Sequence, residues 1–348
     1  MKNILRSSKM INRILKMTTL LFSVVLLSSC GGGGTQVAEG GIGGTGISTG
    51  TITAFGSIWV NGVEFSTAGA KFIEEDDEAG AIILNTNELD DPTELAPYLS
   101  EGMVVTINGT INDDGLTGTA DTISYEDILE GPVVGNPVSG DTSFVALGQT
   151  VLVTTETQYD DGLFTVDDLE DRQVVEISGF RDASGNIHAL YVAKQENDYT
   201  PSDIFEIKGI ASVNSQYELQ IGGLRISTLG RTQDVTVFAG KFVEAKGTFD
   251  GTDLLTASED VEIEDESFDE SDPQLDGYIV ELEGLASTAC GPTAPCEFEM
   301  SGVTVRVETT TTYSGTGSAV TDITTAVKLE AEGIIQNGKL IAESIEFE

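Results

Sequence analysis

The chain offers few groups that could do chemistry, apart from its carboxylates. His188 is the only histidine, and the three cysteines are Cys30, Cys290 and Cys296. Any Ser-His-Asp or Cys-His arrangement would therefore rest entirely on His188. The equivalent places in the other repeats described below hold unrelated residues, Thr119, Thr256 and Ile341. We therefore interpret His188 as an incidental strand residue, and we predict no catalytic residue and no cofactor.

Carboxylates are so numerous that a pair of them carries little information. A pair spaced as in a glycosidase would make a hydrolase, which we keep as an alternative function. Acidic stretches such as residues 74–78 and Asp160-Asp161 lack the alternating acids, central glycine and closing glutamate of an EF-hand. We expect weak calcium association at acidic loops at most, and no defined metal site.

The charge balance excludes one large class of partners. The formal net charge is −41, with 58 Asp and Glu against 17 Lys and Arg. All the acidic residues follow residue 29, whereas five of the basic residues precede it. Nucleic acids are bound mainly by Lys and Arg against phosphates, so this is not a nucleic-acid-binding protein. A solvated acidic surface is the simplest interpretation of the remaining charge.

Cys290 and Cys296 frame a segment rich in Pro and Gly at an expected hairpin. In an oxidising compartment, two cysteines this close are expected to form a disulfide. Their spacing is not the Cys-x-x-Cys of redox motifs, and a zinc site would need further ligands nearby. We therefore predict a structural disulfide.

Trp59 is the only tryptophan and lies on the second expected strand of the first repeat. Aromatic side chains on such strands of OB-type barrels stack on ligands, which makes Trp59 the one candidate ligand-binding residue. The sequence favours the commoner role of a large aromatic side chain, which is to fill the core or one end of a barrel.

The N-terminus has the layout of an export signal. Residues 1–16 are basic without an acid, and residues 17–29 are apolar or small. Leu27-Ser28-Ser29-Cys30 resembles the bacterial lipobox, which implies cleavage after residue 29 and lipidation of Cys30. Gly31 in place of Asp favours the outer membrane by the same resemblance. Residues 30–48 are rich in glycine and are predicted to be a flexible tether.

A short strand pattern that ends in glycine occurs four times in the rest of the chain. It runs from residue 104 to Gly109, from 174 to Gly179, from 242 to Gly247 and from 328 to Gly333. The four glycines are separated by 70, 68 and 86 residues, a spacing that indicates repeated domains. A hairpin signal and a second strand follow each copy. The second strand holds an alanine in all four repeats: Ala120, Ala189, Ala257 and Ala342.

Each repeat is predicted to hold three strands, a short helix or turn, and two more strands. This is the element order of an OB-type barrel, so we predict an all-β chain of about four small five-stranded barrels. A two-sheet sandwich is the alternative fold. The expected units are residues 49–128, 129–197, 203–263 and 277–348, and an acidic, solvated linker over 264–276 precedes the last of them.

The first repeat resembles a known bacterial envelope family. Residues 41–67, with Gly50-Thr51-Ile52 and Ser57-Ile58-Trp59-Val60-Asn61-Gly62-Val63, resemble DUF5666, a domain of unknown function. The later repeats resemble it through the strand that ends in glycine and its hairpin. Membership implies secreted or lipid-anchored tandem β domains, and it implies no activity and no catalytic residues.

These observations predict a lipid-anchored, non-enzymatic protein of the cell envelope. Its repeated barrels would bind a partner, an envelope protein or a polysaccharide, or hold a surface assembly, because repetition without a shared polar site suits multivalent contact. A lipoprotein that binds an oligosaccharide or calcium is the first alternative, and the carboxylate hydrolase is the second.

Overall fold

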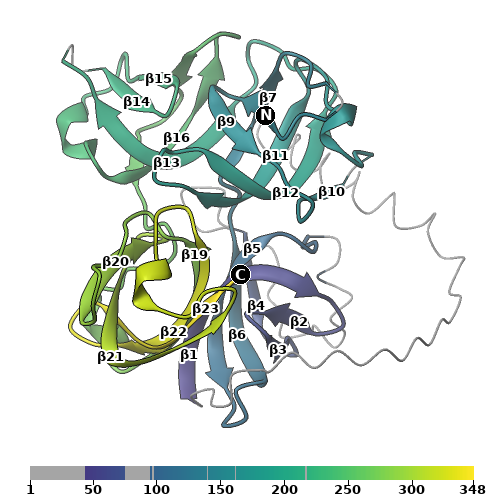
Figure 1. Cartoon of the computed structure of the whole chain (residues 1–348). Helices are drawn as coiled ribbons and strands as arrows, with labels where there is room; N and C mark the ends of the chain where they lie inside the picture. The colour runs from purple at the N-terminus through teal and green to yellow at the C-terminus, as the bar shows by residue number, and fades with distance from the viewer. Residues whose placement is uncertain (1–43, 75–94, 96–97, 139, 161, 216–217) are drawn as a thin grey trace, which may run out of the picture.

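The alternation of apolar and polar residues in the sequence is a burial pattern in the structure. The computed structural model describes residues 44–74, 95, 98–138, 140–160, 162–215 and 218–348, drawn in colour in Figure 1. In strands such as β16 (Phe242–Phe249) and β22 (Lys328–Ile335), every second residue is buried from end to end. Such alternation places one strand face on a core and the other outside.

The first repeat closes into a five-stranded barrel, which we call barrel 1. Its strands pair in the order β1-β2-β3-β6-β5 and back to β1, and β3 runs parallel to β6. A further strand, β4, continues beside β6. The strands are β1 (Gly44–Ala54), β2 (Ile58–Val60), β3 (Val63–Ser66), β4 (Lys71–Glu74), β5 (Val104–Ile111) and β6 (Thr117–Tyr125).

Barrel 2 and barrel 3 repeat this topology. In each, the five strands close in the order first, second, third, fifth, fourth, with the third and fifth parallel. Barrel 2 consists of β7 (Leu129–Val134), β8 (Ser143–Ala146), β9 (Gln149–Leu152), β11 (Val174–Arg181) and β12 (Ile187–Glu196), with β10 (Gln158–Asp160) beside β12. Barrel 3 consists of β13 (Phe205–Val213), β14 (Leu219–Ile221), β15 (Leu224–Ser227), β16 and β17 (Leu254–Ala257), with β18 (Glu262–Ile263) beside β16.

Barrel 4 has the same order but a weaker closure. Its strands are β19 (Ile279–Leu285), β20 (Cys296–Met300), β21 (Val303–Gly315), β22 and β23 (Leu340–Phe347). Only one isolated bridge, Ala286 to Met300, joins the first strand to the second among the described residues. The fold prediction is thus confirmed: the described chain is all-β and is built from four OB-like barrels.

The predicted short helix between the third and fourth strands is a 3₁₀ turn in three of the barrels. These turns are η2 (Val166–Asp168), η3 (Val235–Phe238) and η5 (Val320–Asp322), and a further one, η4 (Pro273–Leu275), lies between barrels 3 and 4. In barrel 1 most of the corresponding segment lies outside the described residues. No helix in the described part of the chain has the length and apolarity needed to cross a bilayer.

The repeated glycine marks the point where the fourth strand meets the fifth most closely. A Cβ on Gly109 would collide with the carbonyl oxygen of Thr119, and the same holds for Gly179 against His188 and Gly333 against Ile341. The pairing register shifts at these three glycines, as in a β-bulge. The sequence pattern therefore has a steric cause, since only glycine fits there.

The four barrels associate in two pairs through their first strands. In one pair, β1 of barrel 1 runs parallel to β19 of barrel 4, from Gly46 opposite Ile279 to Thr49 opposite Leu282. In the other, β7 of barrel 2 runs antiparallel to β13 of barrel 3. Figure 1 shows the second pair above the first. The N-terminal and C-terminal barrels are neighbours because they form the first pair.

The parallel β1–β19 ladder corrects the predicted extent of the tether. Residues 44–48 were expected to be flexible, yet they form the start of β1, and Ile47 and Ser48 are buried. A Cβ on Gly46 would lie 2.9 Å from the carbonyl oxygen of Ile279. Glycine is needed here for close strand packing, and composition alone does not distinguish this role from flexibility.

The hydrophobic cores follow this pairing in one of the two pairs. Barrels 2 and 3 share one continuous cluster of buried side chains, whereas barrels 1 and 4 have separate clusters. A small fourth cluster of Phe180, Leu190 and Leu285, with Val104 against it, joins barrel 2 to barrels 1 and 4. The Val104 amide also donates to Ser178 Oγ at 2.9 Å, so the two pairs are in direct contact.

Candidate functional site

A cavity of about 300 Å³ lies where all four barrels meet. Barrel 1 contributes Thr106 and Asn108 to its wall, barrel 3 contributes Lys208, and barrel 4 contributes Ser301. Residues 264–268, which lead from barrel 3 to barrel 4, complete the wall. Thr106 and Asn108 lie on the fourth strand of barrel 1. Lys208 lies on the first strand of barrel 3 and Ser301 follows the second strand of barrel 4, so different elements of the repeat place polar residues at the junction.

An ion network in barrel 3 borders this cavity. Lys208 is 2% exposed, and its Nζ lies 2.9 Å from Glu206 Oε1 and 3.3 Å from Glu244 Oε1. Lys246 Nζ lies 3.0 Å from the same oxygen of Glu244. Glu126, in the connection between barrels 1 and 2, approaches Lys208 at 3.3 Å. Two lysines are thus interleaved with three glutamates.

The pKa values in this network follow from its charges. Burial disfavours the charged form of Lys208, but the nearby carboxylates, Glu206 first, raise its pKa well above the usual value. Burial also raises the pKa of Glu206, whereas hydrogen bonding to Glu206 and the two ammonium groups lower the pKa of Glu244 to about 2 against the effect of burial. The arrangement is internally compensated, which is typical of a structural network.

A second hollow of about 340 Å³ lies between barrels 1, 2 and 4. Its wall carries five glutamates and one lysine: Glu101, Glu156, Glu283, Glu330, Glu348 and Lys328. Lys328 Nζ lies 2.7 Å from Glu283 and 2.6 Å from Glu348. The wall of the central cavity likewise carries five acidic residues and one lysine, so both cavities are strongly acidic.

Glu283 is held at the hollow by barrel 1. Its carboxylate accepts hydrogen bonds from the backbone amide and the hydroxyl of Thr51, at 2.5 and 3.0 Å. Asn61, in the Asn-Gly turn between β2 and β3, donates to Ser48 Oγ and to the carbonyl oxygen of Thr49, both at 3.1 Å. The predicted hairpin therefore brings a side-chain amide to the contact between barrels 1 and 4.

Trp59 lies on the outer face of barrel 1, and this corrects the core interpretation. Its neighbours Ile58 and Val60 are fully buried, so their side chains point inward and that of Trp59 points outward. Trp59 is half-buried and stands opposite Glu64 on β3. It does not line either of the two cavities described above.

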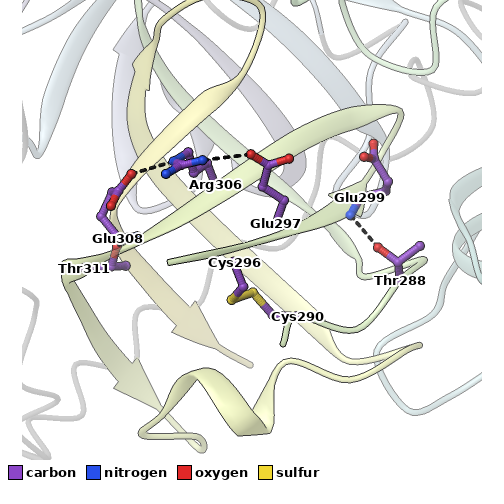
Figure 2. The surroundings of a disulfide bond; sticks show 8 residues. All are labelled: Thr288, Cys290, Cys296, Glu297, Glu299, Arg306, Glu308 and Thr311. Carbon is purple, nitrogen blue, oxygen red and sulfur yellow. Dashed lines mark hydrogen bonds and ion pairs between the residues drawn. A yellow bond between two sulfur atoms is a disulfide. The ribbon is translucent and has the colours of Figure 1, made fainter. Parts of the chain in front are cut away.

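The predicted disulfide is present between Cys290 and Cys296, whose Cα atoms are 5.7 Å apart. Figure 2 shows it beside the start of β20, where Arg306 forms ion pairs with Glu297 and Glu308. Because the single bridge from Ala286 to Met300 joins β19 to β20 nearby, the disulfide reinforces the weakest closure among the four barrels.

Other predicted residues are scattered. The His188 ring lies 3.3 Å from Asp182 in its own hairpin. Cys30, the signal segment and residues 75–78 lie outside the described residues. Asp160 accepts a hydrogen bond from the Tyr191 hydroxyl at 3.4 Å, and its neighbour Asp161 also lies outside them.

The acidic segment at 264–276 connects barrels 3 and 4 as expected, and its first part also packs against them. Residues 264–268 line the central cavity, and the Glu266 side chain contacts Gly302 of barrel 4. Burial raises the pKa of Glu266 to about 7, with Arg181 opposing the shift. The acidic composition of the segment alone favours a solvated linker. The burial of Glu266 depends on the surrounding barrels, whose positions cannot be inferred from local sequence.

Fold and cavities define a class of protein: a four-barrel β protein whose polar residues gather where the barrels meet. The family profile of DUF5666, a domain of unknown function, matches residues 49–124, 130–193 and 293–346, more than half of the chain. The chain therefore belongs to this family. Barrel 3 lies outside the matched residues although its strand order is the same. No curated protein matches the chain.

Proposed function

We propose that this protein is a lipid-anchored component of the bacterial cell envelope that binds or scaffolds a partner and catalyses no reaction. The observation that carries the proposal is the lack of a repeated site on a repeated fold. The outward position two residues after the start of the repeated pattern holds Thr106, Glu176, Glu244 and Glu330 in the four barrels. Thr106 contacts the Thr49 hydroxyl, and Glu176 accepts a hydrogen bond from the Tyr125 hydroxyl. Glu244 pairs with two lysines.

Two exposed apolar side chains indicate where a partner could bind. Phe164 is 80% exposed and Leu229 is 86% exposed, each in the connection between the third and fourth strands of its barrel. Both precede a 3₁₀ turn, η2 or η3. Large apolar groups in the same connection of two paired barrels suit a contact with an envelope protein that engages both barrels at once.

The anchor can be tested separately from the binding role. We expect mass spectrometry of the mature protein to show an acylated N-terminal Cys30, and Cys30→Ser to move the protein from the membrane fraction to the soluble fraction. A mature protein that begins elsewhere and carries no acyl chain would overturn the anchor. It would not affect the binding experiment below.

The binding role can be tested with photo-crosslinking residues in intact envelopes. Probes at positions 164 and 229 should capture the same partner. A probe at position 252, exposed at the hairpin between β16 and β17, is the matched control and should capture none. The proposal would be contradicted if neither apolar position captured a partner, or if the control position captured as much as they did.

An oligosaccharide is the second candidate partner, because Trp59 lies on an outer face beside Glu64. An aromatic ring next to a hydrogen-bond acceptor suits sugar binding. As Trp59 is the only tryptophan, its fluorescence reports on this position alone. A glycan panel that leaves the fluorescence unchanged would remove this candidate.

A further inference from the structure

Barrels 3 and 4 can be compared residue by residue, because their first and fourth strands pair in the same register. Gly209 stands opposite Val243 in barrel 3, and Gly284 stands opposite Leu329 in barrel 4. Counting from these pairs, four outward positions of barrel 3 correspond to four of barrel 4. Glu206, Lys208, Glu244 and Lys246 in barrel 3 correspond to Glu281, Glu283, Glu330 and Glu332 in barrel 4.

The comparison shows that both lysines of the barrel 3 network are glutamates in barrel 4. We call Glu281, Glu283, Glu330 and Glu332 the glutamate quartet. Two of its members, Glu281 and Glu283, are each only 4% exposed. Like charges on directly opposite residues of adjacent strands repel each other, and burial strengthens the repulsion. The quartet therefore requires positive charge from elsewhere.

Lys328 supplies part of this charge, through Glu283 at 2.7 Å, but it is shared with Glu348 at 2.6 Å. Glu332 accepts a hydrogen bond from the Ser344 hydroxyl at 3.1 Å. Glu281 has an oxygen, Oε2, that is buried and has no hydrogen-bond partner within the described residues. Its carboxylate interacts with those of Glu332 and Glu330, so it faces the quartet.

The pKa directions agree with this lack of compensation. Burial first, and then the Glu332 carboxylate, raise the pKa of Glu281 to about 8 despite a hydrogen bond to Ser48. Burial and the Glu281 and Glu283 carboxylates raise the pKa of Glu330 well above its usual value. In barrel 3 the equivalent Glu244 has a lowered pKa despite its burial, because of a hydrogen bond with Glu206 and the charges of Lys208 and Lys246.

Barrel 1 adds a neutral oxygen ligand at the same place. Asn61 Oδ1 is buried without a hydrogen-bond partner among the described residues and lines the hollow together with Glu283 and Glu330. A side chain at Gly50 would collide with both Asn61 Oδ1 and Glu283 Oε2, so these oxygens converge over the glycine. Through its amide nitrogen, Asn61 also orients Ser48, which hydrogen-bonds Glu281.

We propose that the glutamate quartet binds a divalent cation of the calcium type, which enters through the hollow between barrels 1, 2 and 4. Glu281 and Glu330 are the charged ligands, and Asn61 and Glu283 add oxygens from its rim. Calcium prefers carboxylate and amide oxygens and accepts irregular geometry, whereas the site offers no nitrogen or sulfur ligand. The ion performs in barrel 4 the role of Lys208 and Lys246 in barrel 3, and it clamps barrel 1 to barrel 4.

A competing cluster provides the control. Oxygens of Glu244, Glu262 and Glu264 lie within 4.8 Å of one another, and no other such trio occurs among the described residues. The quartet must therefore close around an ion by rotating its side chains, and the hollow leaves room for this beside Glu283 and Glu330, which line it. The trio is the weaker candidate, because Lys208 and Lys246 already neutralise Glu244 and because Glu262 is exposed.

The test is calcium titration of the full chain, purified in detergent and stripped with a chelator, followed by calorimetry and by Trp59 fluorescence. We expect one saturable site and a higher melting temperature with calcium. Glu330→Gln and Glu281→Gln should each weaken binding roughly tenfold or more, since each removes a charged ligand. Glu262→Gln, which affects only the trio, should leave it unchanged.

A charge swap tests the comparison itself. The double variant E283K/E332K gives barrel 4 the pattern of barrel 3, so it should lose calcium binding and yet melt without calcium at least as high as the calcium-free wild type. That melting temperature shows that the variant has folded. Absence of calcium binding by the wild type, undiminished binding by E283K/E332K, or loss of binding in Glu262→Gln would each overturn the proposal.

Discussion

The two barrel pairs use the same strand to associate but depend on different forces. In the pair of barrels 2 and 3, short antiparallel pairing of β7 with β13 accompanies one continuous apolar core and a balanced ion network. In the pair of barrels 1 and 4, a longer parallel ladder between β1 and β19 joins two separate cores, and glutamates dominate the contact. One fold can thus be paired through side-chain burial or through backbone hydrogen bonds.

The largest expected effect concerns the shared core. Phe205 is 2% exposed and lies between barrels 2 and 3. Its ring packs edge-on against that of Tyr199, with the ring centroids 5.4 Å apart. Phe205→Ala should lower the free energy of unfolding by about 3–5 kcal/mol, since truncating a buried phenylalanine leaves a cavity. Chemical denaturation should show both barrels destabilised in one transition. Phe298→Ala, in the separate core of barrel 4, should affect that barrel alone; a common loss in both variants would contradict the comparison.

The parallel ladder should be sensitive to a single side chain. Gly46→Val places a side chain against the Ile279 carbonyl and should cost up to about 3 kcal/mol by forcing β1 and β19 apart. Amide hydrogen exchange at residues 279–282 should accelerate, while exchange in β13 stays slow. Thr110→Ala, at an exposed position of β5, is the control. Unchanged protection in Gly46→Val would show that the ladder does not hold the pair.

Closure of barrel 4 should depend on its disulfide, whereas barrel 3 closes through three residue pairs between β13 and β14. Replacing Cys290 and Cys296 by Ala should destabilise barrel 4 by about 2 kcal/mol, the contribution expected for a loop of this size. A reductant should have the same effect on the wild type and none on the variant. Equal melting of oxidised and reduced protein would contradict this role.

The smallest expected effect is the pH dependence contributed by Glu281 and by Glu244, which should have opposite signs. The folded-state pKa of Glu281 is raised to about 8, so its stabilising contribution is present in acid and lost as pH rises through 8, by about 1 kcal/mol between pH 7 and 9. Glu244, with a pKa lowered to about 2, contributes above the unfolded pKa and loses this as pH falls toward 2. Glu281→Gln should flatten the alkaline loss in calcium-free protein, measured by thermal melting; an unchanged slope would contradict the assignment.

Local signals in the sequence predicted the barrels well, because their causes are local. The Asn61-Gly62 turn has positive φ at both residues, as its hairpin requires, and the repeated glycines meet the backbone of the next strand. The pairing of barrels was not predictable, since β1 and β19 are partners across most of the chain. For the same reason the sequence favours a tether at the start of β1. It favours a core position for Trp59 because large aromatic side chains are usually buried, whereas the alternation along β2 turns this one outward.

The site was harder to predict than the fold. Glu281 and Glu283 alternate with apolar residues, a pattern that indicates an outward, solvated strand face. Their burial arises because barrels 1 and 2 cover that face, and local sequence does not encode this. Alignment of the four repeats would have offered one signal, since two lysines, Lys208 and Lys246, become Glu283 and Glu332. Only one lysine, Lys328 in place of Phe242, is gained on the same strands.

The position of β1 has a mechanical consequence if Cys30 carries the proposed anchor. Tension between the membrane and a bound partner would enter the folded protein at Gly44, the first residue of β1. There β1 is held on one side by β5 and on the other by β19. A pull along this strand loads both sets of hydrogen bonds in shear, so many must break together before β1 can leave the sheet.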